Sequence, residues 1–198
     1  MIIKNASFIT SVASESQFKK FNKPVIAVVG KSNVGKSSFI NMLANQNKLA
    51  KTSDTPGRTR LINYFDFGEF VLADLPGYGY AKVSQSEKDK WGDLMEKFFA
   101  DKKNADYVFS LLDIRHEPTA DDVVMVNCLN NYAYPFSFIA TKSDKISKSE
   151  RKRCLATICR KFAVTEYNVI AVSSQTKDGR EEVLKKLDVI LKNIRTLI

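Results

Sequence analysis

Residues 25–37 read VIAVVGKSNVGKS, an apolar run that leads directly into a glycine-punctuated loop. The run Val25–Val29 is apolar at every position, which is typical of a strand buried on both faces of a parallel sheet. The loop Gly30–Ser37 has the pattern GxxxxGKS, in which backbone N–H groups and the start of the next helix converge on phosphate oxygens. Lys36 then reaches the β and γ phosphates, and the Ser37 hydroxyl is a hard oxygen ligand for the Mg²⁺ that bridges them. These residues predict a strand–loop–helix unit that holds a nucleoside triphosphate by its phosphates.

Two glycines are expected to shape this loop. Gly30 and Gly35 lack Cβ atoms, so the backbone can turn sharply at both positions and bring successive N–H groups together. The alternative is a strand-to-helix turn that contains glycine but holds no ligand. The rest of the chain has to decide between the two interpretations.

The composition describes one globular domain. The chain has 198 residues, 44% hydrophobic and 27% charged, which suffices for a full core. Its apolar runs are far shorter than the roughly 18 to 20 residues that cross a bilayer, and residues 1–20 lack the apolar core of a secretory signal. Three cysteines without a CxxC pair are typical of free thiols in a reducing compartment: Cys128, Cys154 and Cys159. We therefore expect a cytoplasmic protein without a transmembrane segment.

The net charge of +9 and the isoelectric point near 9.4 exceed what one bound nucleotide requires. A basic surface of this size favours a second, extended anionic partner, either nucleic acid or an acidic membrane face. A basic surface that is merely solvated is the alternative.

Strand and helix patterns alternate along the chain. Thr119, with Asp122 three residues later, predicts a capping box at the start of one helix. The runs that read as strands are Val25–Val29, Leu61–Phe67, Phe70–Ala73, Tyr107–Leu112, Phe136–Ala140 and Val169–Val172. Helical spacing follows Ser37, covers residues 86–102, follows Thr119 and Ser147, and closes the chain from Val183 to Leu197.

This order of elements predicts a three-layer α/β fold. Gly68-Glu69 joins two strand-like runs into a hairpin, so one strand should run antiparallel in an otherwise parallel sheet of about six strands, with helices on both faces. Residues 1–23 form a polar lead-in with room for a short strand before Pro24, and residues 24–198 form a single domain. The aromatic residues of the helix at 86–102 are interpreted as core rather than as a platform for base stacking.

Polar motifs stand where predicted strands end, and in such a sheet ligands bind outside those carboxyl ends. Asp74 is placed to hold Mg²⁺ directly or through water, and Gly77 can present its N–H to a γ-phosphate. Asp144 can accept from both N1–H and the 2-amino group of guanine, which adenine lacks, while the stem of Lys142 lies along the ring. A plain turn at 74–77 and an exposed polar loop at 141–144 are the alternatives.

Five motifs in order resemble the EngB family, also called YihA or YsxC, of the TrmE-Era-EngA-EngB-septin-like superfamily: GKSNVGKSSFIN, TPGRT, DLPGYGYAKVS, DIRHEP and TKSDK. The resemblance covers about residues 24–190. It implies a P-loop NTPase of the small-GTPase-like type, which binds GTP or GDP with Mg²⁺ and hydrolyses GTP slowly. It also implies a switch in assembly of the large (50S) ribosomal subunit, needed for normal cell division and septation.

The partners expected from charge and resemblance together are the large ribosomal subunit and its RNA, bound through a basic surface by a monomer. No DNA partner is expected. A GTP-dependent division or septation protein that acts at the inner membrane, without a ribosomal role, is the main alternative, although no separate basic amphipathic helix stands ready to anchor it. Small-molecule kinase chemistry is a further alternative, which lacks a lid-like insertion rich in arginine.

The resemblance also implies which residues form the site. The phosphates and the base would be held by Gly30, Lys31, Ser32, Asn33, Val34, Gly35, Lys36, Ser37, Ser38, Gly57, Arg58, Thr59, Asp74, Leu75, Pro76, Gly77, Thr141, Lys142, Ser143, Asp144, Ser173, Ser174 and Gln175. Mg²⁺ would be held by Ser37, Thr59 and Asp74, and catalysis would fall to Lys36, Thr59 and Gly77.

Three positions depart from the commonest GTPase pattern or add to it. Thr141 replaces the usual Asn, which removes an amide contact and is expected to lower nucleotide affinity. Tyr78 stands where many GTPases carry the Gln that orients water, so intrinsic hydrolysis should be slow. In related GTPases an Asn at the position of Asn33 helps to bind K⁺, and such a cation would stabilise developing charge.

His116, the only histidine, is expected to be structural or to contact a partner rather than to act as a base.

Overall fold

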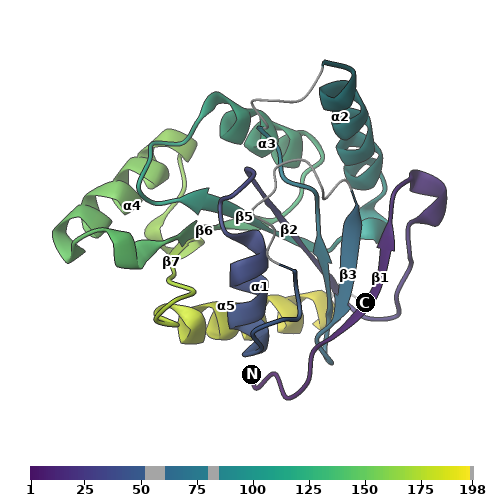
Figure 1. Ribbon diagram of the computed structural model, residues 1–198, viewed down its shortest axis with the longest axis horizontal. Coiled ribbons are helices and arrows are strands. Elements are labelled where there is room, and N and C mark those ends of the chain that lie inside the picture. The colour runs from purple at the N-terminus through teal and green to yellow at the C-terminus, as the bar shows by residue number, and fades with distance from the viewer. Residues whose placement is uncertain (52–60, 80–84, 197–198) are drawn as a thin grey trace.

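The computed structural model describes residues 1–51, 61–79 and 85–196, which form one central sheet with helices on both sides (Figure 1). Within these residues the sheet has seven strands in the order β1-β3-β4-β2-β5-β6-β7. The strands are β1 Ser7–Val12, β2 Val25–Gly30, β3 Ile62–Asp66, β4 Val71–Asp74, β5 Tyr107–Asp113, β6 Phe136–Thr141 and β7 Val169–Ala171.

Strand β3 is the one reversed strand of this sheet. It pairs antiparallel with both β1 and β4, whereas the remaining neighbours pair in parallel. The prediction of a mostly parallel sheet with one antiparallel strand is therefore confirmed. The sheet has one strand more than the six or so expected, because residues 7–12 of the lead-in join its edge. Only Val12 of β1 is buried, so the sequence of this strand lacks the alternation of apolar and polar residues that would have predicted it clearly.

Within the described ranges, five α-helices cover the two faces of the sheet unequally. Side chains of β2 alternate, so that Ile26 and Val28 pack with α1 and α5, while Ala27 and Val29 pack with α2 and α3. Helix α4 adds its single buried residue, Ile158, to a smaller cluster beneath the β5–β6–β7 end. The helices are α1 Lys36–Ala44, α2 Gln85–Ala100, α3 Ala120–Asn131, α4 Lys148–Phe162 and α5 Arg180–Thr196, and 3-10 turns occur at Glu15–Gln17, Lys102–Asn104, Ser143–Lys145 and Glu166–Asn168.

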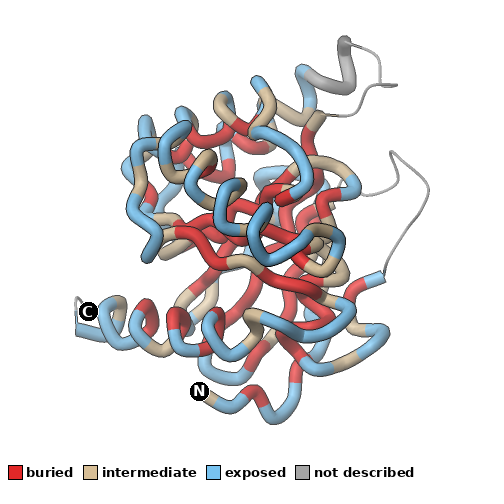
Figure 2. The backbone as a smooth tube through the Cα atoms, turned by 90° about the vertical axis from the view of Figure 1, so that its left-hand side faces the viewer, coloured by how far each residue is buried: buried red, intermediate tan, exposed pale blue. Residues whose placement is uncertain are grey.

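Two local predictions are also confirmed. The backbone N–H of Thr119 donates to the Asp122 carboxylate at 2.7 Å, which completes the capping box of α3. On α2, Phe98 and Phe99 are fully buried and therefore belong to the core. Figure 2 shows the result for the whole chain: buried strands run through the middle and exposed helix faces lie outside. All parallel strands thus end at one edge of the sheet, and the polar motifs meet there.

Candidate functional site

The loop after β2 is shaped by two glycines with different tasks. Gly35 has φ +107° and caps the N-terminus of α1 in a left-handed conformation, which explains the need for glycine. Gly30 does not have a positive φ; a Cβ there would come within 3.0 Å of the Leu111 carbonyl oxygen and 2.9 Å of Val34 Cγ1. Gly35 therefore serves the turn through its backbone conformation, whereas Gly30 leaves space for Val34 of the same loop and for Leu111 of β5.

Asp74 ends β4 opposite Val28 of β2, and so reaches the loop from the neighbouring strand. Its side chain is 5% exposed, and Oδ1 has no hydrogen-bond partner within the described part of the chain. Burial raises the pKa of Asp74, with the Lys36 ammonium and Asn63 opposing that rise. Burial likewise lowers the pKa of Lys36, which Asp74 opposes. A buried carboxylate oxygen without a donor fits a hard cation or its bound water, so the residues present fit Mg²⁺.

The segment after β4 lies directly against the loop. A Cβ on Gly77 would stand 3.1 Å from Lys36 Nζ and 3.1 Å from the Ser32 backbone nitrogen. The Ser32 N–H donates to the Tyr78 carbonyl at 2.8 Å, and Lys31 pairs with Tyr78 in a parallel bridge. The structure therefore brings Asp74–Gly77 and the loop together, as the motif order predicts.

The side chain of Tyr78 points away from this contact. It belongs to the cluster beneath α2 and α3, its hydroxyl donates to Asp122 Oδ1 at 2.8 Å, and its ring meets Trp91 edge-on at 5.8 Å. Burial and the Asp122 carboxylate both raise the pKa of Tyr78. Trp91 Nε1 also donates to the Pro76 carbonyl at 3.1 Å. Tyr78 thus fastens the segment to α2 and α3.

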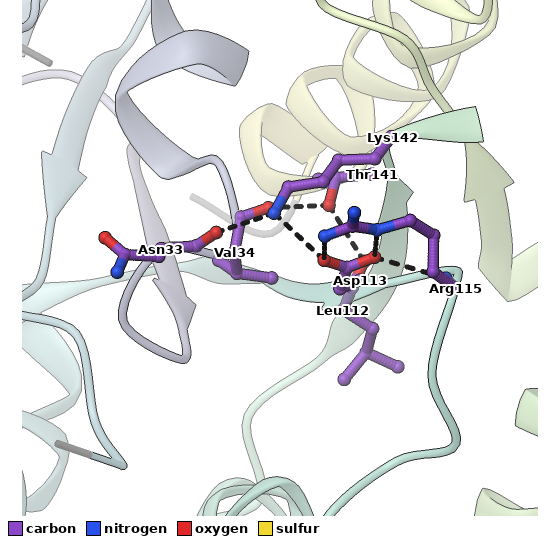
Figure 3. A network of polar contacts seen from close by, with 7 residues as sticks. All are labelled: Asn33, Val34, Leu112, Asp113, Arg115, Thr141 and Lys142. Atoms are coloured by element: carbon purple, nitrogen blue, oxygen red, sulfur yellow. Dashed lines mark hydrogen bonds and ion pairs between the residues drawn. The ribbon is translucent and has the colours of Figure 1, made fainter. Parts of the chain in front are cut away.

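Two neighbouring residues at the end of β6 contact the loop Gly30–Ser37, which is called the phosphate loop below. Thr141 Oγ1 donates to the Val34 carbonyl at 2.7 Å, and Lys142 Nζ donates to the Asn33 carbonyl at 2.8 Å (Figure 3). Thr141 is buried, and Lys142 has φ +62°. Although Thr141 lacks the amide of the usual Asn, its hydroxyl makes a direct link to the loop.

Asp144 is held by the segment that follows β7. Ser173 Oγ donates to Asp144 Oδ1 at 2.7 Å, which lowers the pKa of Asp144, and Lys145 Nζ lies 3.1 Å from Oδ2. Ser143 is buried, and its hydroxyl has no partner within the described residues. A charged carboxylate oriented in this way can accept hydrogen bonds from a guanine edge.

A cavity of about 530 Å³ lies between these segments and the first turns of α1. Predicted residues in its lining are Gly35, Ser38, Thr141, Lys142, Asp144, Ser174 and Gln175. The remaining lining residues were not among those expected from the sequence: Asn41, Met42, Asn45, Gln46, Asn47, Lys145 and Lys177. Ser38 and Asn41 are three residues apart on α1, a spacing that sets both on one face of the helix and that the sequence could have indicated.

Several predicted residues lie elsewhere or have other contacts. Gly57, Arg58 and Thr59 lie outside the described residues. Leu75 is 1% exposed and is part of the core, and the side chain of Lys31 pairs with Asp121 at 3.8 Å on the α3 side. Asn33 is exposed with φ +61°. In the described ranges no cluster of three or more His, Cys, Asp or Glu side chains is arranged to hold a metal.

Among the helices described, none has the length and apolar character needed to span a bilayer. The three cysteines are free and partly buried.

Comparisons with known proteins agree with this arrangement. A family model described as "50S ribosome-binding GTPase" matches residues 25–142. The "Probable GTP-binding protein EngB" of Caldanaerobacter subterraneus subsp. tengcongensis is 45% identical over 192 residues, which cover 96% of this chain and 99% of that protein. The protein of the same name from Clostridium kluyveri is 46% identical over 193 residues, 96% of this chain and 98% of that protein.

Solved structures support the fold. The crystal structure of a probable GTP-binding protein engB has a TM-score of 0.75 at 23% identity, and covers 85% of this chain and 99% of that one. Era in complex with MgGDPNP and part of 16S ribosomal RNA has a TM-score of 0.68 at 22% identity, covering 83% of this chain and 55% of that one. The predicted α/β fold of the P-loop GTPase type is thereby confirmed.

Proposed function

Since this chain belongs to the EngB family of GTP-binding proteins, we propose that it is a GTP-controlled switch acting in assembly of the large (50S) ribosomal subunit. As a member of that family it is a GTPase. GTP would favour binding to the subunit, and hydrolysis would release the protein. In this proposal residues 24–198 form the GTPase domain, residues 1–23 its lead-in, and the protein acts as a cytoplasmic monomer needed for normal division and septation.

The observation that carries the nucleotide assignment is the oriented carboxylate of Asp144 beside the cavity. Ser173 occupies one of its oxygens, and Lys142 and Thr141 connect the same loop to the phosphate loop at Asn33 and Val34. Carboxylate recognition of a base with two adjacent donors favours guanine over adenine. The α- and β-phosphates would then lie along Gly30–Ser38, where the N-terminus of α1 begins.

Mg²⁺ would be held by Ser37, Thr59 and Asp74, where it would neutralise charge on the phosphates. Lys36 would bind the transferred phosphoryl group, and the N–H of Gly77 would contact it. Tyr78 is hydrogen-bonded to Asp122 and packed on Trp91, so it does not take the part of a water-orienting Gln. Slow intrinsic hydrolysis is expected for that reason.

Potassium stimulation is a separate part of the proposal. Asn33 stands exposed in the phosphate loop, while its carbonyl oxygen is engaged by Lys142. Its carboxamide is therefore the group available to a monovalent cation beside the phosphates. Turnover of GTP should be faster in K⁺ than in Na⁺ at equal ionic strength, and Asn33→Ala should abolish the difference. Equal turnover of the unmodified protein in the two salts would contradict this.

Ribosome binding would use helix α4. Only Ile158 of this helix is buried, and its single acidic residue, Glu150, forms the capping box with Ser147. Five basic side chains of α4 are exposed: Lys148, Lys152, Arg153, Arg160 and Lys161. A cationic face without compensating acids suits RNA phosphates, whose binding weakens steeply with salt.

The experiment that tests the proposal is sedimentation of the full-length protein with purified 50S subunits, loaded with GDP or with a non-hydrolysable GTP analogue. Cofractionation should depend on the nucleotide, fall as salt rises, and be lost in Lys36→Ala. Vesicles of acidic phospholipid serve as the second arm. Sedimentation with vesicles but not with subunits would favour the division protein at the inner membrane and overturn the ribosomal proposal.

A further inference from the structure

The carboxylate of Asp113, at the end of β5, lies at the centre of a polar network that reaches the nucleotide site from behind (Figure 3). Arg115 Nε donates to Oδ1 at 2.9 Å, and one terminal nitrogen of Arg115 donates to Oδ2 at 2.7 Å. Lys142 Nζ approaches the same Oδ2 at 2.9 Å. In the pairing of β5 with β6, Asp113 lies opposite Thr141. The Asp113 carboxylate is therefore next to the segment 141–144, which is proposed to bind guanine.

Lys142 links the Asp113 carboxylate to the loop Gly30–Ser37. Its ammonium donates to the Asn33 carbonyl at 2.8 Å while it pairs with Asp113. Its stem crosses the loop, since Cε lies 4.0 Å from the place where a Gly35 Cβ would stand. Fixing a lysine side chain costs conformational entropy. The two acceptors of Lys142, the Asn33 carbonyl and the Asp113 carboxylate, offset that cost.

The charge on Asp113 is permanent at physiological pH. Burial by itself would raise its pKa, but the hydrogen bonds from Arg115 and Lys142 outweigh burial and lower the pKa to about 2. The Asp113 side chain is 16% exposed, whereas that of Arg115 is 39% exposed and faces outward. Two cations, Arg115 and Lys142, thus share this one carboxylate.

We propose that Asp113 is a positioning residue for the nucleotide, which it serves by holding Lys142 across the phosphate loop and along the base. The inference rests on the proposed guanine site and adds to it the residue that fixes its lysine. Asp113 touches neither phosphate nor base itself. It acts through Lys142, while Arg115 pairs with the same carboxylate from the solvent side.

The alternative is a local role, because Asp113 also accepts from the backbone N–H of Arg115 at 3.1 Å and so shapes the turn after β5. A turn role would lower the stability of the nucleotide-free protein and would not depend on Lys142. A positioning role would change nucleotide release, depend on Lys142, and leave hydrolysis of GTP already bound nearly unchanged. These two sets of readouts separate the interpretations.

The experiment is a double-mutant cycle on the full-length protein, with Asp113→Asn, Lys142→Met and the pair, and the dissociation rate of a fluorescent GDP analogue as readout. Asp113→Asn should speed dissociation about tenfold, as expected for loss of a charge-assisted contact. In the Lys142→Met background the same change should have less than about a twofold effect. Arg115→Gln, the matched control, keeps the Asp113–Lys142 pair and should stay within about twofold of the unmodified protein.

Two further measurements accompany the cycle. The melting temperature of nucleotide-free Asp113→Asn should stay close to that of the unmodified protein, and its single-turnover hydrolysis rate should be unchanged. Unchanged dissociation in Asp113→Asn, or equal acceleration with and without Lys142, overturns the inference. If the Asn variant does not fold, Asp113→Glu keeps the charge, displaces it by one methylene, and should give an intermediate acceleration; no acceleration would again overturn it. Failure of the unmodified protein to bind GDP would instead refute the guanine site.

Discussion

Among single residues, two glycines without a positive φ differ in how much space surrounds the position of a Cβ atom. Gly77 has no positive φ, but a Cβ there would press on the Ser32 backbone at 3.1 Å. Gly92 lies within α2 with no atom within 4 Å of its virtual Cβ. The two positions therefore respond to the same substitution in opposite ways.

Gly77→Ala should weaken guanine-nucleotide binding by about tenfold, because the Ser32 backbone has to shift to accept the new methyl group. Gly92→Ala, its matched control, should leave binding unchanged and raise the free energy of unfolding by about 0.5–1 kcal/mol, the helix preference of alanine. Titration calorimetry with GDP and urea unfolding measure the two quantities. Equal nucleotide affinities of the two variants would show that Gly77 does not approach the loop in solution.

At the scale of elements, Asp122 connects α3 to the segment after β4. The same carboxylate accepts from Tyr78 and closes the capping box with Thr119. Trp91 of α2 holds Pro76 from the other side. The position of Gly77 over the phosphate loop is thus set by two helices that are distant from it in sequence.

Tyr78→Phe should lower the free energy of unfolding by about 1–3 kcal/mol, because the buried Asp122 carboxylate loses a donor. The melting temperature should fall by roughly 2–4 °C per kcal/mol for a chain of this size. Tyr167→Phe is the matched control, since Tyr167 is 65% exposed. A melting temperature for Tyr78→Phe equal to that of the control would contradict a stabilising role of the Tyr78–Asp122 hydrogen bond.

At the scale of the whole molecule, the positive charge is unevenly distributed. Helix α4 carries exposed Lys152 and Arg153 with one acid, Glu150. Helix α5, by contrast, carries three acidic residues, Glu181, Glu182 and Asp188, among its basic ones. Helix α4 therefore carries more uncompensated positive charge than α5, and long-range attraction to RNA would come from its exposed face.

Reversal of two charges on α4, Lys152→Glu with Arg153→Glu, should weaken 50S binding by about tenfold or more at low salt and reduce the salt dependence, because fewer phosphates are neutralised. GDP affinity should be unchanged. Lys185→Glu with Lys192→Glu on α5 changes the net charge equally and should have a much smaller effect. Equal loss of binding in both double variants would show that net charge, and not α4, governs the interaction.

Features encoded within a few consecutive residues were predictable from sequence. The strand–loop–helix at 25–44, the capping box of Thr119 and the order of the motifs all depend on local periodicity or on short patterns, whose physics acts over one or two turns of chain. The edge strand β1 was only weakly predictable, since edge strands bury few side chains and carry little alternation.

The class of fold, the strand–loop–helix at 25–44 and the order of the motifs followed from the sequence alone, because each depends on a contiguous pattern. The direction of the Tyr78 side chain, the close packing at Gly30 and the partners of Lys142 became known only from the three-dimensional arrangement of the elements. Tyr78 and Asp122 are 44 residues apart, and Lys142 and Asn33 are 109 residues apart. Contacts over such separations arise from strand order and helix packing, which no local pattern records.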